Sequence, residues 1–153
     1  MIKNERQYRI TKAQAQKFEQ ALADLANCAE GQRQENPILF AAQISALQSQ
    51  LDELREELTE YETLATHGND EPLVFELNSL EALPLALIKA RIAAKLSHKD
   101  LAERLGLKEQ QIQRYEATEY ASANLARVIE VSQILGLKLQ SRAGIAVGLE
   151  RSP

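Results

Sequence analysis

The chain has 153 residues, of which 44% are hydrophobic and 26% charged, and Ala, Leu, Gln and Glu dominate, which favours helices. It contains no run of about 18 uncharged apolar residues, so we expect no membrane-spanning helix. Residues 1–20 are charged throughout and contain no apolar signal-peptide core. Cys28 is the only cysteine, which excludes an intrachain disulfide and favours a reducing compartment, the cytoplasm.

The charge is distributed unevenly along the chain. Residues 1–83 contain 7 Lys and Arg against 15 Asp and Glu, a net charge of −8. Residues 84–153 contain 11 against 7, a net charge of +4, and the two parts add to the overall −4. The C-terminal part therefore suits a polyanionic partner, although the whole chain is acidic.

Two N-terminal segments have apolar residues at helical spacing. A first helix is expected over 11–30, before a stop signal at Gly31. Asn36 and Pro37 then provide an N-cap and a first helical residue, and predict a second helix over 37–66. Its apolar residues follow a 4-3-4-3-4-3 spacing, the seam of a coiled coil: Phe40, Ile44, Leu47, Leu51, Leu54, Leu58 and Tyr61.

We expect these two helices to fold back on each other as an antiparallel hairpin. Because a two-helix hairpin has a poor core, the seam predicts a homo-oligomer, at least a dimer, in which a second copy of the chain covers it. The alternative is a hairpin that packs only on the C-terminal domain of its own chain.

Turn residues at 68–72 interrupt the helical pattern. The sequence therefore predicts a helical hairpin over 1–67, a linker or arm over 68–83, a C-terminal domain over 84–141 and a tail over 142–153. The fold class is expected to be all-α, with two segments, 73–77 and 137–141, that are each also compatible with a short strand.

Four helices are expected in the C-terminal domain, the first over 84–96. Ser97 is a good N-cap for the second, with Asp100 in the capping-box position, and Gly106 can end that helix at a positive φ. The third begins near Lys108 and ends near Glu116. The fourth, over 122–135, is expected to face inward through Leu125, Val128, Ile129, Ser132 and Leu135.

Two helices joined by a short turn that contains glycine form a helix-turn-helix arrangement. The stretches LSHKDLAERLGL (96–107) and QIQRYE (111–116) resemble the XRE family, to which phage lambda repressor and Cro belong. The resemblance covers about residues 85–136, with small Ala102 and turn Gly106 at the expected intervals. Antitoxins of the HigA type share this domain, and the stretches LIKARIAA (87–94) and EQQIQRYE (109–116) look like that antitoxin-like subset.

The resemblance implies that the free face of the third helix contacts base edges in the major groove. Glutamine there suits adenine and arginine suits guanine. At the start of the second helix, Ser97 suits a phosphate and His98 lies where the family often has a DNA-contacting glutamine. The expected DNA-binding residues are Ser97, His98, Lys99, Lys108, Glu109, Gln110, Gln113 and Arg114.

Arg91 and Glu116 occupy positions that resemble a structural ion pair of the phage repressors. Glu109 stands where glutamine is common, and the loop over 117–121 lacks the Lys or Arg often found there. We therefore expect a moderate affinity for DNA that depends on dimer formation. The alternative is a degenerate helix-turn-helix that binds only proteins.

No catalytic, cofactor or metal site is indicated, and we do not expect an enzyme. His67 and His98 are far apart and are expected at the surface, and Cys28 lacks a nearby histidine and is expected to be a packing residue. Four acidic residues are expected on the solvated face of the long helix: Glu53, Glu56, Glu57 and Glu60.

The sequence thus predicts a sequence-specific transcriptional regulator that binds double-stranded DNA as a homo-oligomer. The alternative is an antitoxin that neutralises a toxin protein and represses its own operon. A neighbouring gene for a small basic nuclease-like protein would favour the antitoxin.

Overall fold

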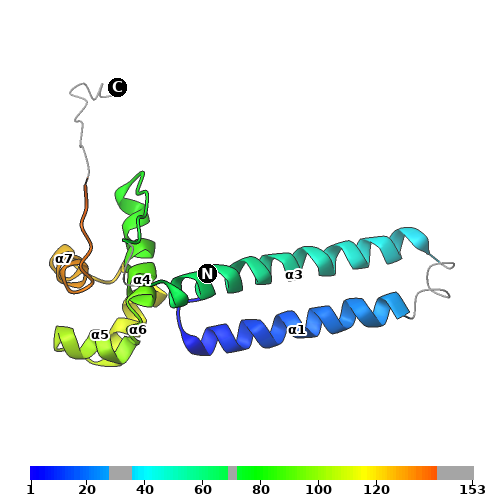
Figure 1. Ribbon diagram of the computed structural model, residues 1–153, viewed down its shortest axis with the longest axis horizontal. Helices are drawn as coiled ribbons and strands as arrows, with labels where there is room; N and C mark the ends of the chain where they lie inside the picture. The colour runs from blue at the N-terminus through cyan, green and yellow to red at the C-terminus, as the bar shows by residue number, and fades with distance from the viewer. Residues whose placement is uncertain (28–35, 69–71, 141–153) are drawn as a thin grey trace, which may run out of the picture.

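The structure is a computed structural model that describes residues 1–27, 36–68 and 72–140. All regular elements in these ranges are helices, so the prediction of an all-α fold is confirmed. The first two helices form a long arm, and the others form a bundle at one end of it (Figure 1). In chain order the elements are α1 (Glu5–Asn27), α3 (Pro37–Thr66), the 3-10 helix η1 (Leu80–Ala82), α4 (Leu83–Ala93), α5 (His98–Leu105), α6 (Glu109–Ala117) and α7 (Leu125–Ile134).

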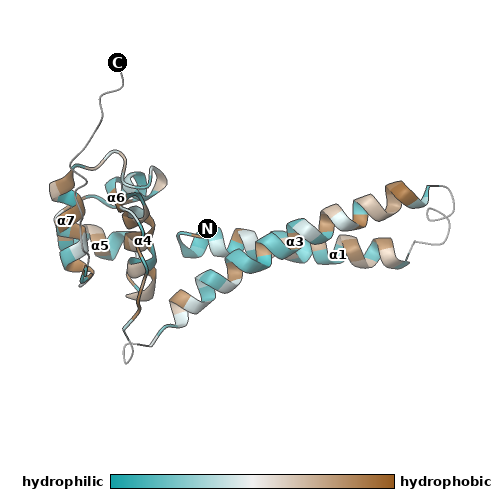
Figure 2. Ribbon diagram, turned by 90° about the horizontal axis from the view of Figure 1, so that it is seen from above, coloured by the Kyte–Doolittle hydropathy of each residue, from teal (hydrophilic) through white to brown (hydrophobic). Residues whose placement is uncertain are grey.

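Helices α1 and α3 run antiparallel and form the predicted hairpin (Figure 1). Near the bundle, the ring of Tyr8 stacks on that of Tyr61 with their centroids 5.1 Å apart, and the Tyr8 hydroxyl donates a hydrogen bond to Glu62. Farther along the arm, Arg55 forms an ion pair with Glu19 at 2.8 Å. Hydrophobic residues gather in the bundle and at the distal end of the arm, whereas the middle of the arm is largely hydrophilic (Figure 2).

Helix α1 begins earlier than the sequence analysis expected, at Glu5 and not at Thr11. The Asn4 side chain caps it by accepting a hydrogen bond from the Gln7 backbone N–H at 2.9 Å. The Gln7 side chain in turn accepts from the Lys3 N–H at 2.7 Å, so the two side chains satisfy free donors at the helix start. This polar signal lies before the first residue of the apolar stripe, and the stripe alone misplaced the start of the helix.

Helix α3 has the predicted limits. Asn36 accepts a hydrogen bond from the Leu39 N–H at 3.1 Å, and Pro37 occupies the first turn. Helix α1 covers the apolar seam unevenly: Phe40 and Leu51 are buried, and the other five seam residues are only half-buried. The residues between α1 and α3 that the sequence analysis considered, Cys28 and Gly31, lie outside the described residues.

The segment over 72–77 forms no strand, and neither does the described part of 137–141. In the first segment Leu73, Phe75 and Leu77 are half-buried while Val74 and Glu76 are exposed. Leu73 and Phe75 pack on the core of the bundle. The alternation that was compatible with a strand therefore reflects side chains that dock onto helices, without a neighbouring strand to pair with. The tail over 142–153 lies outside the described residues.

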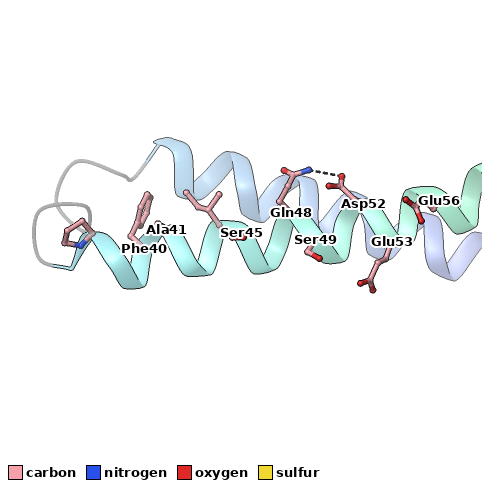
Figure 3. A pocket seen from close by; sticks show the side chains of 10 residues that line it. Phe40, Ala41, Ser45, Gln48, Ser49, Asp52, Glu53 and Glu56 are labelled. Carbon is pink, nitrogen blue, oxygen red and sulfur yellow. Dashed lines mark hydrogen bonds between the residues drawn. The ribbon is translucent and has the colours of Figure 1, made fainter.

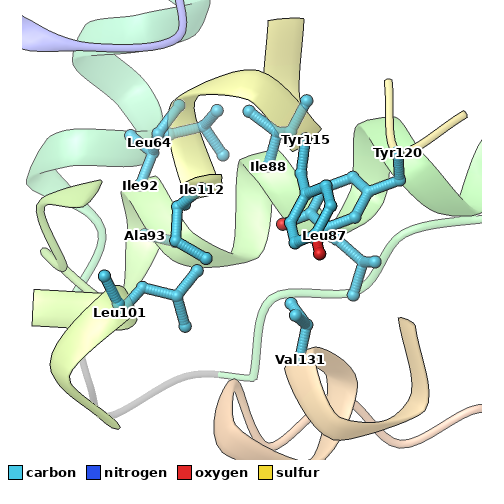
Figure 4. Close-up of a cluster of buried hydrophobic side chains, with 11 residues drawn as sticks. Leu64, Leu87, Ile88, Ile92, Ala93, Leu101, Ile112, Tyr115, Tyr120 and Val131 are labelled. Carbon is cyan, nitrogen blue, oxygen red and sulfur yellow. The ribbon is translucent and has the colours of Figure 1, made fainter. Parts of the chain in front are cut away.

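The core of the bundle is formed by apolar side chains from all four of its α-helices (Figure 4). Leu87, Ile88, Leu101, Ile112 and Val131 are 0% exposed and lie at its centre. Leu64, from the last turn of α3, is 6% exposed and belongs to the same cluster. Arm and bundle therefore share one core, and the arm has a fixed direction relative to the bundle.

Helix α4 ends at Ala93, three residues before the predicted end at Leu96. Lys95 has φ 56°, in the left-handed region. Its N–H donates to the Ile92 carbonyl and the Leu96 N–H donates to the Arg91 carbonyl, which is a Schellman C-cap. A lysine occupies the position that usually requires glycine, so the sequence carried no stop signal there.

Helix α7 begins at Leu125, where Asn124 caps it by accepting from the Arg127 N–H at 2.9 Å. The prediction that Leu125 and Ile129 face the core is wrong, because they are 72% and 46% exposed. The helix packs through Val128, Val131 and Leu135 instead. Leu125 lies in the first turn, and Leu125 and Ile129 together form an exposed apolar stripe, one turn apart.

Candidate nucleic-acid interface

Helices α5 and α6 and the turn between them have strong local signals. The Ser97 hydroxyl accepts from the Asp100 N–H at 3.1 Å, and the Asp100 carboxylate accepts from the Ser97 N–H at 2.8 Å, so the predicted capping box is present. Gly106 has φ 66°, and the Leu107 N–H donates to the Ala102 carbonyl at 2.8 Å. These bonds end α5 and turn the chain into α6.

Helix α6 is anchored on one side and free on the other. Ile112, Tyr115 and Glu116 are buried and hold it against the bundle. The side chain of Ala102 on α5 is 1% exposed, so a larger residue would have no space beside the neighbouring helix. The opposite side of α6 and the residue before it expose five polar side chains: Lys108, Glu109, Gln110, Gln113 and Arg114.

Within this exposed face, the Gln113 side chain donates a hydrogen bond to the Glu109 carboxylate at 3.0 Å. This bond satisfies one oxygen of the carboxylate and orients the amide along the helix. Gln110 and Arg114 point from the same face without a side-chain partner among the described residues. They are consequently available to form hydrogen bonds with another molecule.

The buried end of α6 contains a charged cluster. The Arg91 guanidinium donates from Nε to Glu116 Oε1 at 2.5 Å and from Nη2 to Oε2 at 2.8 Å, which is the ion pair that the resemblance implied. The two residues are 3% and 1% exposed. Arg91 also donates to the carbonyls of Leu96 and Lys3. All three nitrogens of the guanidinium therefore donate to acceptors, which stabilises the buried cation.

His98 is the third member of this cluster. It is only 9% exposed, and its Nε2 lies 2.8 Å from Glu116 Oε2. Because a carboxylate can only accept, Nε2 carries a hydrogen and donates it. The prediction that His98 is a surface group is therefore wrong, because its ring is buried against Glu116. Its assignment to DNA binding stays a prediction. The first turn of α5 lies against the end of α6, which sequence spacing did not reveal.

Burial raises the pKa of the Glu116 carboxyl, but the hydrogen bonds from His98 and Arg91 and the charge of Arg91 lower it more. The net result is a pKa below the ordinary 4.5. Glu116 is therefore ionised at neutral pH, and it ties α4, α5 and α6 together.

The start of α5 does not offer the simple phosphate site that the sequence suggested. The Ser97 hydroxyl donates to the Asp100 carboxylate at 2.6 Å, and both groups are at the helix N-terminus. These hydrogen bonds from Ser97 lower the pKa of the Asp100 carboxyl, which keeps it negatively charged. An anion that approaches Ser97 would meet this charge. Lys99, in the first turn of α5, is exposed, and its ammonium lies 3.9 Å from the carboxylate of Glu103.

The first residues of the chain close over the buried cluster. Ile2 is 3% exposed, and the Lys3 ammonium donates to the Glu116 carbonyl at 2.7 Å, at the C-terminal end of α6. The terminal ammonium of Met1 pairs with Glu57 of α3 at 2.7 Å. Sequence reasoning missed the contact between Lys3 and Glu116 because the two residues are 113 positions apart in the chain.

The loop after α6 contains two residues in the left-handed region, Glu119 with φ 49° and Tyr120 with φ 59°. For a residue with a side chain this conformation costs about 1–2 kcal/mol. Tyr120 is 3% exposed, and its ring stacks on that of Tyr115 with centroids 6.0 Å apart. The burial of the ring in the core offsets the backbone strain and fixes the loop.

The order and geometry of these elements agree with a family comparison, in which residues 87–141 match the helix-turn-helix family. This region is a helix-turn-helix domain of the XRE type. Such domains bind DNA, with α5 and α6 as the two helices of the motif and α6 as the recognition helix. Searches among curated proteins and among solved structures give no significant match to the chain.

The described residues also bear on other classes of site. They contain no cluster of His, Cys, Asp and Glu side chains with the arrangement of a metal site. Glu53, Glu56, Glu57 and Glu60 line one open face of α3. Among the helices in these ranges, none combines the length and the hydropathy needed to cross a bilayer.

Proposed function

We propose that the protein is a sequence-specific transcriptional regulator that binds operator DNA as a homo-oligomer. The observation that carries this proposal is the exposed polar face of the recognition helix. Had Gln110, Gln113 and Arg114 been packed against the arm, the helix could not enter a groove of the duplex. All three are exposed, and the anchoring residues on the other side hold the helix rigidly.

Each exposed side chain suits a specific contact. Gln110 and Gln113 can form paired hydrogen bonds with the N6 and N7 atoms of adenine, and Arg114 with the O6 and N7 atoms of guanine. Glu109 can accept from the amino group of cytosine. Lys108 precedes the helix and suits a phosphate, as does Lys99 on α5.

Self-association of the arm completes the proposal. A two-helix hairpin covers each seam residue from one side only, so Ile44 borders one groove of the arm and Leu47 another. The groove that Ile44 borders is apolar near Phe40 and polar from Ser45 to Glu56 (Figure 3). The groove that Leu47 borders is more apolar, and its lining residues are Ile10, Ala13, Gln14, Lys17, Phe18, Ala21 and Leu47.

Ile10 lies at the rim of this second groove, on a stripe of α1 with Ala13 and Lys17. Helix α3 does not cover this stripe, and Ile10 is therefore 57% exposed. A second copy of the arm offers the same stripe and can bury both, as in an isologous interface of two hairpins. The two helix-turn-helix domains would then read two half-sites about one helical turn apart. In this arrangement residues 1–67 assemble the protein and residues 84–141 bind the operator.

A gel-shift experiment with the promoter DNA of the protein's own gene tests the regulator. We expect Gln110→Ala/Arg114→Ala to bind about 10- to 100-fold more weakly than wild type, since each bidentate base contact contributes about 1–3 kcal/mol. Gln133→Ala/Lys138→Ala, which removes one amide and one cation from exposed positions on and just after α7, is the control and should bind like wild type. Equal binding by the two double variants would refute the assigned recognition face.

Sedimentation velocity tests the assembly. Ile10→Glu places a charge in the apolar groove without disturbing a buried side chain, and we expect it to dissociate the oligomer. Leu125→Glu, on the exposed stripe of α7, is the matched control. Recovery of a small basic nuclease-like protein with the purified chain would favour the antitoxin function over the regulator.

A further inference from the structure

The first turn of α1 and the bundle enclose a groove of about 800 Å³ beside the recognition helix. The charged cluster of Arg91, His98 and Glu116 lines part of it. Its outer residues come from three separate elements, two of which carry expected DNA-binding residues. They are Arg6 and Arg9 of α1, Lys95 and Ser97 of the turn between α4 and α5, and Glu109 and Gln113 of α6.

Three cations in this groove have no acidic partner within the described part of the chain: Arg6, Arg9 and Lys95. All three are exposed. An unpaired cation loses no existing ion pair when it binds an anion, so these three side chains are ready for an external negative charge.

The charge of the arm also changes sign toward the groove. Residues 1–12 contain four cations and one acid, a net side-chain charge of +3. Because residues 1–83 together have a net charge of −8, residues 13–83 have a net charge of −11. The acidic part of the arm points away from the recognition helix, and its basic end lies next to it (Figure 1). This basic end is hidden when the charge is summed over residues 1–83.

We propose that Arg6, Arg9 and Lys95 bind phosphates of duplex DNA that flanks the bases read by α6. The arm then forms a second part of the DNA interface, in addition to its role in assembly. This inference rests on the proposed function, because it assigns further contacts to the same DNA. Glu109, Gln113 and the two arginines line the same groove, so residues suited to base contacts and residues suited to phosphate contacts lie close together.

The position of the two arginines is fixed by the packing of the residues before them. Ile2 is buried, the Lys3 ammonium binds the carbonyl of Glu116, and the Lys3 carbonyl accepts from Arg91. The start of α1 is thus held by two hydrogen bonds between Lys3 and the helix-turn-helix domain, one of them at the end of the recognition helix. Side chains on a rigid element bind with a smaller loss of conformational entropy than those of a free basic tail.

The test is fluorescence anisotropy of labelled promoter DNA and of a duplex of unrelated sequence, at several salt concentrations. For Arg6→Gln/Arg9→Gln we expect binding on the order of tenfold weaker to both duplexes, with the preference between them retained. The slope of log affinity against log salt should fall by about 2, because each lost phosphate contact removes about 0.9. Arg55→Gln/Lys138→Gln, with the same change of charge at exposed positions outside the groove, should keep the wild-type slope.

The inference would be overturned if Arg6→Gln/Arg9→Gln had the salt slope and affinity of the control. In that case a preference of wild type for the promoter duplex would still support the proposed function. Tighter binding by the variant would overturn the inference as well, since the arm would then obstruct the duplex. A change in sedimentation without a change in salt slope would assign the arginines to a contact between copies. No preference of wild type for the promoter duplex would refute the proposed function itself.

Discussion

Replacement of Arg91 by alanine is the sharpest test of how the recognition helix is held. The guanidinium is 3% exposed and donates to both oxygens of Glu116 and to two backbone carbonyls. Without it, the Glu116 carboxylate remains buried with only His98 as a side-chain partner. Removal of one member of a buried ion pair typically costs about 3–5 kcal/mol.

A loss of that size is a large part of the 5–15 kcal/mol, roughly, by which a domain is stable. For a chain of this size it lowers the melting temperature by about 6–20 °C. Urea denaturation followed by circular dichroism gives the free energy of unfolding. DNA binding of the folded fraction at low temperature should keep the wild-type base preference, because Arg91 does not lie on the exposed face of α6.

A double-mutant cycle separates the ion pair from the other bonds of Arg91. We expect the loss of unfolding free energy in Arg91→Met/Glu116→Gln to be about 2 kcal/mol smaller than the sum of the losses in the two single variants. The double variant is favoured because it leaves neither member of the ion pair buried without the other. The reasoning is refuted by an Arg91→Ala protein that changes its base preference and keeps its stability. Additive single losses would refute the coupling.

Three further predictions concern the same domain. Stability should fall as the pH drops below about 4.5, because the pKa of Glu116 is lower in the folded state than in the unfolded state. The contribution of Glu116 to stability is present above the unfolded pKa and is lost when the carboxylate is protonated. Arg91→Ala should flatten this part of a curve of stability against pH. Gly106→Ala should cost about 1–2 kcal/mol from its positive φ alone, since a Cβ would meet no atom within 4 Å, whereas Gly68→Ala, in equally open space, should not. Tyr120→Phe should leave stability unchanged or raise it by up to about 1 kcal/mol, because the buried hydroxyl has no hydrogen-bond partner in the described ranges; a clear loss in thermal denaturation would contradict this.

The sequence alone determined the features that depend on groups within a few residues of one another. The Asn36 cap with Pro37, the Ser97 and Asp100 capping box and the positive φ of Gly106 are local hydrogen bonds and backbone preferences, and they appear where the sequence predicts them. The hairpin also followed from one apolar stripe in each of two neighbouring helices.

The sequence signals for other positions were ambiguous or misleading. A lysine at 95 and a tyrosine at 120 adopt the left-handed conformation that normally indicates glycine. The apolar residues of α7 allowed two inward faces, and only the position of the core around Val131 selects one. At Tyr120 and along α7, packing supplied a free energy larger than the local preference that the pattern reports. At Lys95, which is exposed, the hydrogen bonds of the C-cap hold the conformation.

Only the tertiary structure decided what surrounds the recognition helix. His98 is buried because the start of α5 lies on the end of α6. The basic first turn of α1 is beside the exposed face of α6 because Lys3 forms hydrogen bonds with Arg91 and Glu116. Such contacts depend on how distant segments pack, for which local spacing contains no information. The sequence of α6 therefore determined which side chains it exposes, and the tertiary packing determined which residues surround it.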